Sequence, residues 1–147
     1  MLIASISGIR GTLGEKIGEN LTRVDVRAFV AAYAMLLARK KGIKKIVIGR
    51  DARESGVWIK REIVDVCTKF GMDVYDLDLA TTPTVELAVP ALRASAGIII
   101  SASHNPIEWN GLKFLNERGE IVNAALGKRM LALYAKGEAQ PPQTTKK

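Results

Sequence analysis

Cysteine and histidine are nearly absent, since the 147 residues include one of each, Cys67 and His104. A single cysteine cannot form an internal disulfide, which is typical of a protein from a reducing compartment. We interpret Cys67 as a small buried residue of a predicted helix. A zinc site needs several histidine or cysteine ligands, so the scarcity of both residue types excludes one.

Long apolar runs and aromatic residues are also scarce. No apolar run approaches the roughly 18 residues of a membrane-spanning helix, and the segment 1–8 lacks the basic region of a signal peptide. We therefore expect a cytoplasmic protein with no membrane partner. The chain has two Trp, three Tyr and three Phe residues. Because bases are bound largely by stacking on aromatic side chains, we also expect no nucleic-acid partner.

The sequence does contain enough apolar residues for a core, together with an excess of positive charge. Apolar residues make up 48% of the chain, and its formal net charge is +7. An apolar share of this size in a chain of this length predicts one globular domain. A net positive charge favours an anionic partner, of which a phosphorylated small molecule is one kind.

Helical and strand patterns alternate through the middle of the chain. We expect strands at 45–49, 72–79, 97–100 and 112–115, and helices that begin at Thr22, Ser55, the Thr-Thr-Pro-Thr segment around Pro83, and Asn123. Parallel neighbouring strands need crossover connections, so this order predicts a three-layer α/β/α domain with a mostly parallel mixed sheet. We expect the domain to occupy residues 1–137. The polar, proline-bearing segment 138–147 is typical of a linker.

Three polar loops each follow a predicted strand, at residues 50–55, 80–84 and 101–110. The carboxyl ends of parallel strands lie at one edge of a sheet, and sites in such sheets form there. We therefore expect the three loops to converge on one edge.

The third loop contains the candidate nucleophile, in the sequence Ser-Ala-Ser-His-Asn-Pro. Ser103 is a candidate for a nucleophile, a phosphate carrier or a turn residue. No Gly-x-Ser-x-Gly elbow surrounds it, and His104 is its immediate neighbour, so a serine-hydrolase triad is excluded. Turns at Asn105 and at Asn110-Gly111 would bring Lys113 back toward Ser103. An amine beside a hydroxyl can act as its base or neutralise a phosphate bound to it.

Two further arginine-containing segments are candidate anion sites. Arg10 stands in Ser-Gly-Ile-Arg-Gly, whose glycines allow an anion to approach the backbone; the alternative is a surface arginine. Arg50, Asp51 and Arg53 are interpreted as an ion-pair network that orders their loop.

These motifs in this order resemble the first domain of the α-D-phosphohexomutases, over about residues 5–114. That family includes phosphoglucomutases, phosphomannomutases and phosphoglucosamine mutases. The resemblance rests on S-G-I-R-G, G-R-D-A-R-E-S-G, T-P-T, S-A-S-H-N-P and N-G-L-K. It implies that Ser103 carries a phosphoryl group, which it gives to a hexose 1- or 6-phosphate. The bisphosphorylated sugar then returns its other phosphate to Ser103.

The resemblance also implies roles for other residues. It assigns proton transfer and charge stabilisation to Lys113 and Arg10, and it makes His104 a further catalytic residue, which positions the phosphoryl group. Positioning of substrate or phosphate is expected from three more residues, which are Asn105, Gly11 and Arg50. The implied metal is Mg2+, held by the phosphate of Ser103 and by aspartates of a second domain. Hexose 1,6-bisphosphate is the implied intermediate and activator.

The sequence departs from the family in what it lacks. Members have four domains, and the sequence Asp-Gly-Asp-x-Asp-Arg, which holds the metal, is not present. We therefore expect the chain alone to be inactive, with a phosphosugar and the other domains of the same polypeptide as its partners. With Ser101 where many mutases have threonine, the Ser-Ala-Ser-His-Asn-Pro motif resembles that of phosphoglucosamine mutases. The Glu-Trp-Asn-Gly segment instead resembles glucose and mannose enzymes, so the sequence leaves the identity of the hexose open. The alternative function is a non-catalytic module that binds phosphate or a sugar phosphate.

Overall fold

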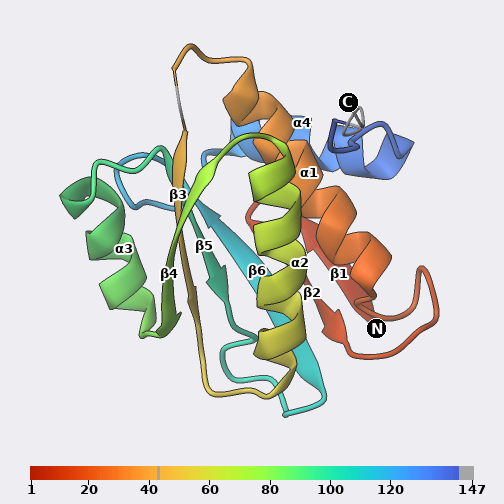
Figure 1. Ribbon diagram of the computed structural model, residues 1–147. Coiled ribbons are helices and arrows are strands. Elements are labelled where there is room, and N and C mark those ends of the chain that lie inside the picture. Colours follow the sequence, from red (N-terminus) through yellow and green to blue (C-terminus); the bar gives the residue numbers. More distant parts are fainter. Residues whose placement is uncertain (43, 143–147) are drawn as a thin grey trace, which may run out of the picture.

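The computed structural model describes residues 1–42 and 44–142, which form a six-stranded sheet and its covering helices (Figure 1). The strands are β1 (Leu2–Ser5), β2 (Gly8–Thr12), β3 (Lys45–Arg50), β4 (Asp73–Leu79), β5 (Ala96–Ile100) and β6 (Trp109–Leu115). The helices are α1 (Arg23–Ala38), α2 (Ser55–Lys69), α3 (Thr82–Ala91) and α4 (Ala124–Lys136).

The sheet is mixed, with strand order β1-β2-β6-β5-β3-β4. Strand β3 pairs in parallel with β4 and β5, and the remaining pairings are antiparallel. The mixed sheet of an α/β fold is confirmed, but its parallel part is smaller than the sequence indicated. Two causes account for the difference: β6 returns antiparallel beside β5, and β1 and β2 form an N-terminal hairpin that the sequence patterns did not predict.

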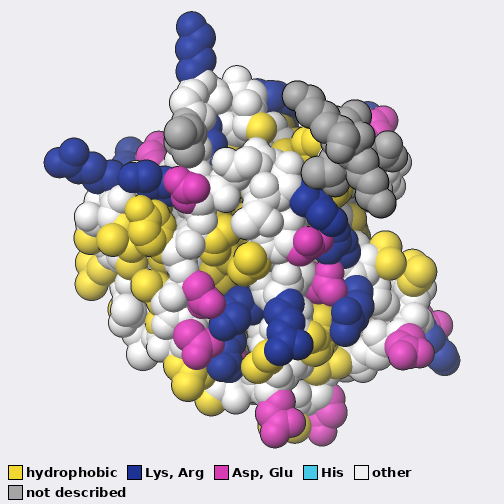
Figure 2. Space-filling model, viewed as in Figure 1, with side chains coloured by type: hydrophobic (Ala, Val, Ile, Leu, Met, Phe, Trp, Pro, Cys, Tyr) yellow, Lys and Arg dark blue, Asp and Glu magenta, His cyan; other side chains and the backbone are white. Residues whose placement is uncertain are grey.

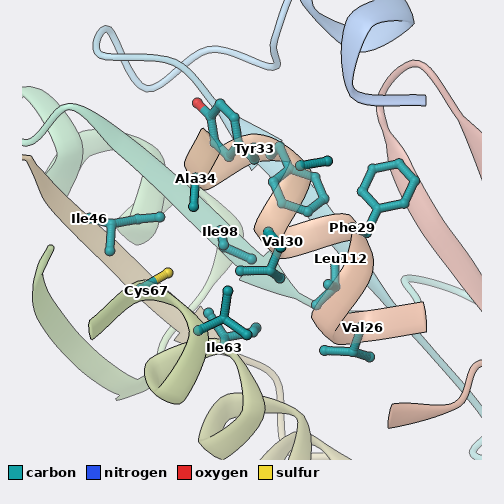
Figure 3. Close-up of a cluster of buried hydrophobic side chains, with 14 of the residues drawn as sticks. Val26, Phe29, Val30, Tyr33, Ala34, Ile46, Ile63, Cys67, Ile98 and Leu112 are labelled. Atoms are coloured by element: carbon teal, nitrogen blue, oxygen red, sulfur yellow. The ribbon is translucent and has the colours of Figure 1, made fainter. Parts of the chain in front are cut away.

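Helices cover both faces of the sheet, which confirms the three layers. One apolar cluster joins α1, α2 and α4 to one face, and a smaller one joins α3 to the other. Figure 3 shows the larger cluster, where Phe29 and Tyr33 of α1 lie near Ile98 of β5 and Leu112 of β6. Cys67 is buried in this cluster, as expected, and burial raises the pKa of its thiol to about 12.

Two glycines allow α3 to approach its face of the sheet closely. A Cβ atom added to Gly49 of β3 would lie 2.3 Å from Cγ2 of Val85, and one added to Gly97 of β5 would lie 2.8 Å from Cγ2 of Val89. Both distances are below any normal carbon–carbon contact, so side chains at these positions would push α3 away from the sheet.

The ends of most helices follow local signals in the sequence. Thr22 caps α1, and its backbone N–H bonds in return to the carboxylate of Asp25. Asn123 caps α4, and Pro83 lies in the first turn of α3. The prediction that Ser55 caps α2 is wrong. Glu54 occupies that position, and the Ser55 hydroxyl instead accepts a hydrogen bond of 2.8 Å from the buried amide of Asn110.

The segment 138–147, interpreted as a linker, lies only partly within the described residues, because residues 143–147 are outside them. Ala139 is buried against the larger apolar cluster. Among the described residues, none of the helices combines the length and apolar character that crossing a bilayer requires.

Candidate functional site

The three polar loops converge at one edge of the sheet, as the strand order predicted. The N–H of Asp51 donates to the carbonyl of Ile100 at 3.0 Å, which joins the loops after β3 and β5. The N–H of Ala80 donates to the carbonyl of Arg50 at 3.1 Å, which joins the loop after β4. Polar side chains from separate parts of the sequence therefore have a common location.

Ser103 lies at this edge of the sheet, with an exposed side chain and an unusual backbone conformation. Its φ angle is 54°, in the left-handed region that costs a residue other than glycine about 1–3 kcal/mol. Its N–H donates to the hydroxyl of Ser101 at 3.0 Å, which helps to hold the conformation. Strain of this kind persists only where surrounding contacts enforce it, and such positions cluster at functional sites.

Lys113 reaches Ser103 from strand β6. Its Nζ atom donates a hydrogen bond of 3.0 Å to the Ser103 hydroxyl oxygen. The contact was expected, but the turn expected at Asn110-Gly111 is wrong, because both residues lie inside β6 and pair with β2. A Cβ on Gly111 would lie 2.8 Å from Cβ of Arg10, so the glycine serves strand pairing here. The chain turns earlier, between Ser103 and Glu108.

A pocket of about 280 Å³ brings Ser103 and Lys113 together with Arg10. Arg10 comes from β2, where its side chain is exposed and its backbone lies opposite Gly111. The charged residues that line this pocket are Arg10 and Lys113, and both are cationic. A hydroxyl flanked by two cations suits a phosphate, either bound or covalently attached.

The remaining candidate residues have different surroundings. His104 is exposed and makes no hydrogen bond to a described residue, whereas Asn105 is half-buried and its N–H donates to the Ala102 carbonyl at 3.0 Å. Gly11 is buried in β2, where an added Cβ would lie 2.7 Å from the Met1 carbonyl oxygen. This glycine therefore allows β1 to pair closely, and the pocket does not include it.

Arg50 also lies outside the pocket. Its Nε donates to the carboxylate of Asp78 at 2.8 Å, and Lys60 donates to the same oxygen at 2.9 Å. The hydrogen bonds from Lys60 and Arg50 lower the pKa of Asp78. The structure thus brings Arg10, Ser103 and Lys113 together and places Arg50 in a separate ion-pair cluster.

Arg53 contacts the Ser103 loop directly. The sequence predicted only an ion-pair network within the loop that contains Arg53 itself. Its guanidinium donates to the carbonyl of Ser103 at 3.1 Å and to that of Asn105 at 2.7 Å. The expected ion pair with Asp51 is present at 3.2 Å. One signal was available in the sequence. Arg53 and Ser103 each follow a predicted strand, and the loops after these strands were expected to meet at one edge of the sheet.

The described residues by themselves do not form a magnesium site. No group of three or more His, Cys, Asp or Glu side chains among them could hold a metal ion. The pocket around Ser103 has cations where Mg2+ would require oxygen ligands. The hydroxyls of the pocket are uncharged, and a phosphate attached to Ser103 would add anionic oxygen ligands.

Sequence comparison identifies the family of this chain. Residues 2–141 match the family described as phosphoglucomutase/phosphomannomutase, alpha/beta/alpha domain I. The chain belongs to this family. The family predicted from the sequence motifs is therefore confirmed.

Individual relatives support the assignment. The phosphoglucosamine mutase of Alkaliphilus metalliredigens is 41% identical over 112 residues, which are 76% of this chain and 24% of that protein. The phosphoglucosamine mutase of Wolinella succinogenes is 33% identical over 135 residues, or 92% of this chain and 29% of that protein. The chain thus spans 24% and 29% of the length of these two relatives.

Comparison of structures leads to the same family. The crystal structure of a phosphoglucomutase/phosphomannomutase family protein from Burkholderia thailandensis superposes with a TM-score of 0.77 and 25% sequence identity. The similarity covers 93% of this chain and 30% of that one.

Proposed function

We propose that this chain is the phosphoserine-bearing domain of a phosphohexomutase, which interconverts hexose 1-phosphate and hexose 6-phosphate in the cytoplasm. The observation that carries the proposal is the hydrogen bond of 3.0 Å from Lys113 to the Ser103 hydroxyl, in a pocket that also contains Arg10. Membership of the phosphoglucomutase/phosphomannomutase family supports it.

In the proposed first step, phosphate passes from phosphorylated Ser103 to the free hydroxyl of a hexose phosphate. The bond between phosphorus and the Ser103 oxygen breaks while a bond forms between phosphorus and the sugar oxygen. The sugar hydroxyl loses its proton to solvent water, and the Lys113 ammonium supplies a proton to the departing serine oxygen, which leaves Lys113 neutral. The product is a hexose 1,6-bisphosphate.

In the second step the other phosphate of this sugar returns to Ser103, by the same bond changes in reverse, and the departing sugar oxygen takes a proton from solvent water. Lys113 now accepts the proton of the Ser103 hydroxyl, and its neutral and charged forms alternate over the cycle. Arg10 keeps its charge throughout and stabilises the phosphoryl oxygens during both transfers. Free hexose 1,6-bisphosphate could load an unphosphorylated Ser103 by this second step, which would make it the activator.

Magnesium enters this proposal through the phosphate of Ser103 and through aspartates outside this chain. Bound Mg2+ would neutralise charge on the phosphoryl oxygens. Because the described residues supply no acidic ligand set of their own, we expect the chain alone to be inactive. The further domains of the same polypeptide are then its partners, together with the phosphosugar.

The experiment is a turnover assay on the polypeptide that contains this chain, with glucose, mannose and glucosamine 1-phosphates offered separately. We expect one of them to be converted to its 6-phosphate, and we expect Ser103→Ala to abolish the conversion. If the chain is instead a non-catalytic binding module, neither protein converts any substrate, and hexose phosphate binds equally well to the Ser103→Ala variant.

A further inference from the structure

Every hydrogen-bond donor of the Arg53 guanidinium has a partner in the structure. One terminal nitrogen donates to the carbonyls of Pro106 and Trp109, at 2.6 and 3.1 Å. The other donates to the carbonyls of Ser103 and Asn105, at 3.1 and 2.7 Å. The Nε atom donates to the carboxylate of Asp51 at 3.2 Å. A guanidinium has five N–H donors in a rigid fork, so this arrangement uses all of them.

The carboxylate that holds Arg53 is itself fixed to the sheet. Asp51 accepts from the Arg53 backbone N–H at 3.1 Å as well as from its side chain. The backbone of Asp51 donates to Ile100, the last residue of β5. Arg53 is thus anchored beside the strand that leads into the Ser103 loop, and its side chain is only 14% exposed.

Arg53 contacts the loop entirely through backbone carbonyls, from Ser103 itself to Trp109 where β6 begins. These contacts fix where the loop starts and ends, and they include the residue with a left-handed backbone. The loop also has internal hydrogen bonds, such as the one from the Trp109 N–H to the Pro106 carbonyl at 2.9 Å. In this backbone conformation the Ser103 hydroxyl accepts the hydrogen bond from Lys113.

We propose that Arg53 is a positioning residue for phosphoryl transfer: it holds the Ser103 loop by its carbonyls and thereby keeps the Ser103 oxygen against Lys113. Arg53 touches no reacting atom, and its charge is balanced by Asp51. The catalytic part of this inference rests on the proposed function. The structural part concerns the conformation of the loop and can be measured without catalysis.

The test uses Arg53→Lys, which keeps the positive charge but has three donors on one nitrogen in place of the planar fork. Amide hydrogen exchange of Asn105 and Trp109, followed by NMR in the 147-residue chain, reports on the loop. We expect exchange at both amides to become about tenfold faster. In the complete polypeptide we expect kcat to fall about 10- to 100-fold with little change in KM, because misplacement of a reacting group slows the chemical step.

The matched control is Arg27→Lys. Arg27 also has two ion-pair contacts, to Glu62 at 2.7 Å and to Asp65 at 2.8 Å, but these join α1 to α2. This variant should leave loop exchange and kcat unchanged. The inference is overturned if Arg53→Lys keeps parental kcat, whether or not loop exchange changes. If the parent polypeptide shows no turnover, the proposed function fails, and unchanged loop exchange in Arg53→Lys would then overturn the structural part as well.

Discussion

The two faces of the sheet are covered very differently. On one face α1, α2 and α4 enclose a large apolar cluster, in which the ring of Phe114 lies 5.4 Å from that of Phe29 and 5.3 Å from that of Tyr33. On the other face α3 packs against β3 and β5 through a much smaller cluster, and this cluster takes only Leu115 from β6 and no residue from β1 or β2. The pocket with Arg10, Ser103 and Lys113 is lined by residues of β1, β2 and β6 and by the Ser103 loop.

The two faces of the sheet also differ in their distribution of charge. Over the helices of the well-covered face, basic and acidic side chains alternate, as Figure 2 shows, and pair with one another, as Arg27 does with Glu62 and Asp65. Around Ser103 the charged lining residues are cations without acidic partners in the pocket. The well-covered face thus stabilises the fold, and the partly covered face leaves cations available for an anionic ligand.

The sharpest test of this difference between the two faces uses Lys113 and Phe114, neighbouring residues of β6 that point to opposite faces of the sheet. Lys113→Met removes the amine beside Ser103, and we expect turnover by the complete polypeptide to fall about 100- to 10,000-fold, the usual contribution of a positioned acid or base. Unfolding of the chain in urea should change by less than about 0.5 kcal/mol. Lys128→Met, an exposed lysine of α4, is the control and should change neither quantity.

Phe114→Ala, one residue further along β6, should show the opposite behaviour. Phe114 is fully buried between Phe29 and Tyr33, so its truncation should lower the free energy of unfolding by about 3–5 kcal/mol. Urea denaturation of the 147-residue chain measures this. A loss below about 1 kcal/mol would mean that the large cluster is not the main source of stability.

The close approach of α3 predicts a smaller effect. Gly97→Ala places a methyl group 2.8 Å from Cγ2 of Val89, and we expect a loss of about 1–3 kcal/mol in urea unfolding. Combining it with Val89→Ala should cost less than the two single changes added together, because the second change makes room for the first. Simple additivity would contradict the close packing of α3.

The smallest predicted effect concerns Asp78, at the edge strand β4. Lys60 and Arg50 lower its pKa in the folded chain, so its contribution to stability is present above its ordinary pKa of 3.8 and is lost as the pH falls through the lowered value. Asp78→Asn should therefore reduce the fall in unfolding free energy between about pH 6 and about pH 3. Asp73→Asn is the control, because Asp73 makes no ion pair with a described residue. Equal pH dependence in both variants would contradict the assignment.

Local features of the fold were predictable because they depend on neighbouring residues. The caps at Thr22 and Asn123 and the proline in α3 need only the few residues around them. The hairpin of β1 and β2 was not predictable in the same way, because it completes its pairing with β6, about 100 residues later. Ser55 and Asn110 were misread for a related reason, since each satisfies the other across the fold.

The contacts of the site likewise differ in how far the sequence predicted them. The contact between Ser103 and Lys113 was predicted, although through a turn that the structure replaces with a strand. Arg53 was recognised only as a partner of Asp51, because the sequence does not reveal that its remaining donors reach carbonyls some 50 positions away. Contacts to backbone atoms leave no trace in the types of the residues that accept them.

The central claim is that Ser103 carries phosphate, and mass spectrometry tests it most directly. The complete polypeptide would be purified, its intact mass measured, and its phosphate located by peptide mapping before and after incubation with hexose 1-phosphate. We predict one phosphate on Ser103, transferred to the sugar as hexose 1,6-bisphosphate and lost in Ser103→Ala. A polypeptide that converts hexose 1-phosphate without phosphate ever appearing on Ser103 would contradict the account.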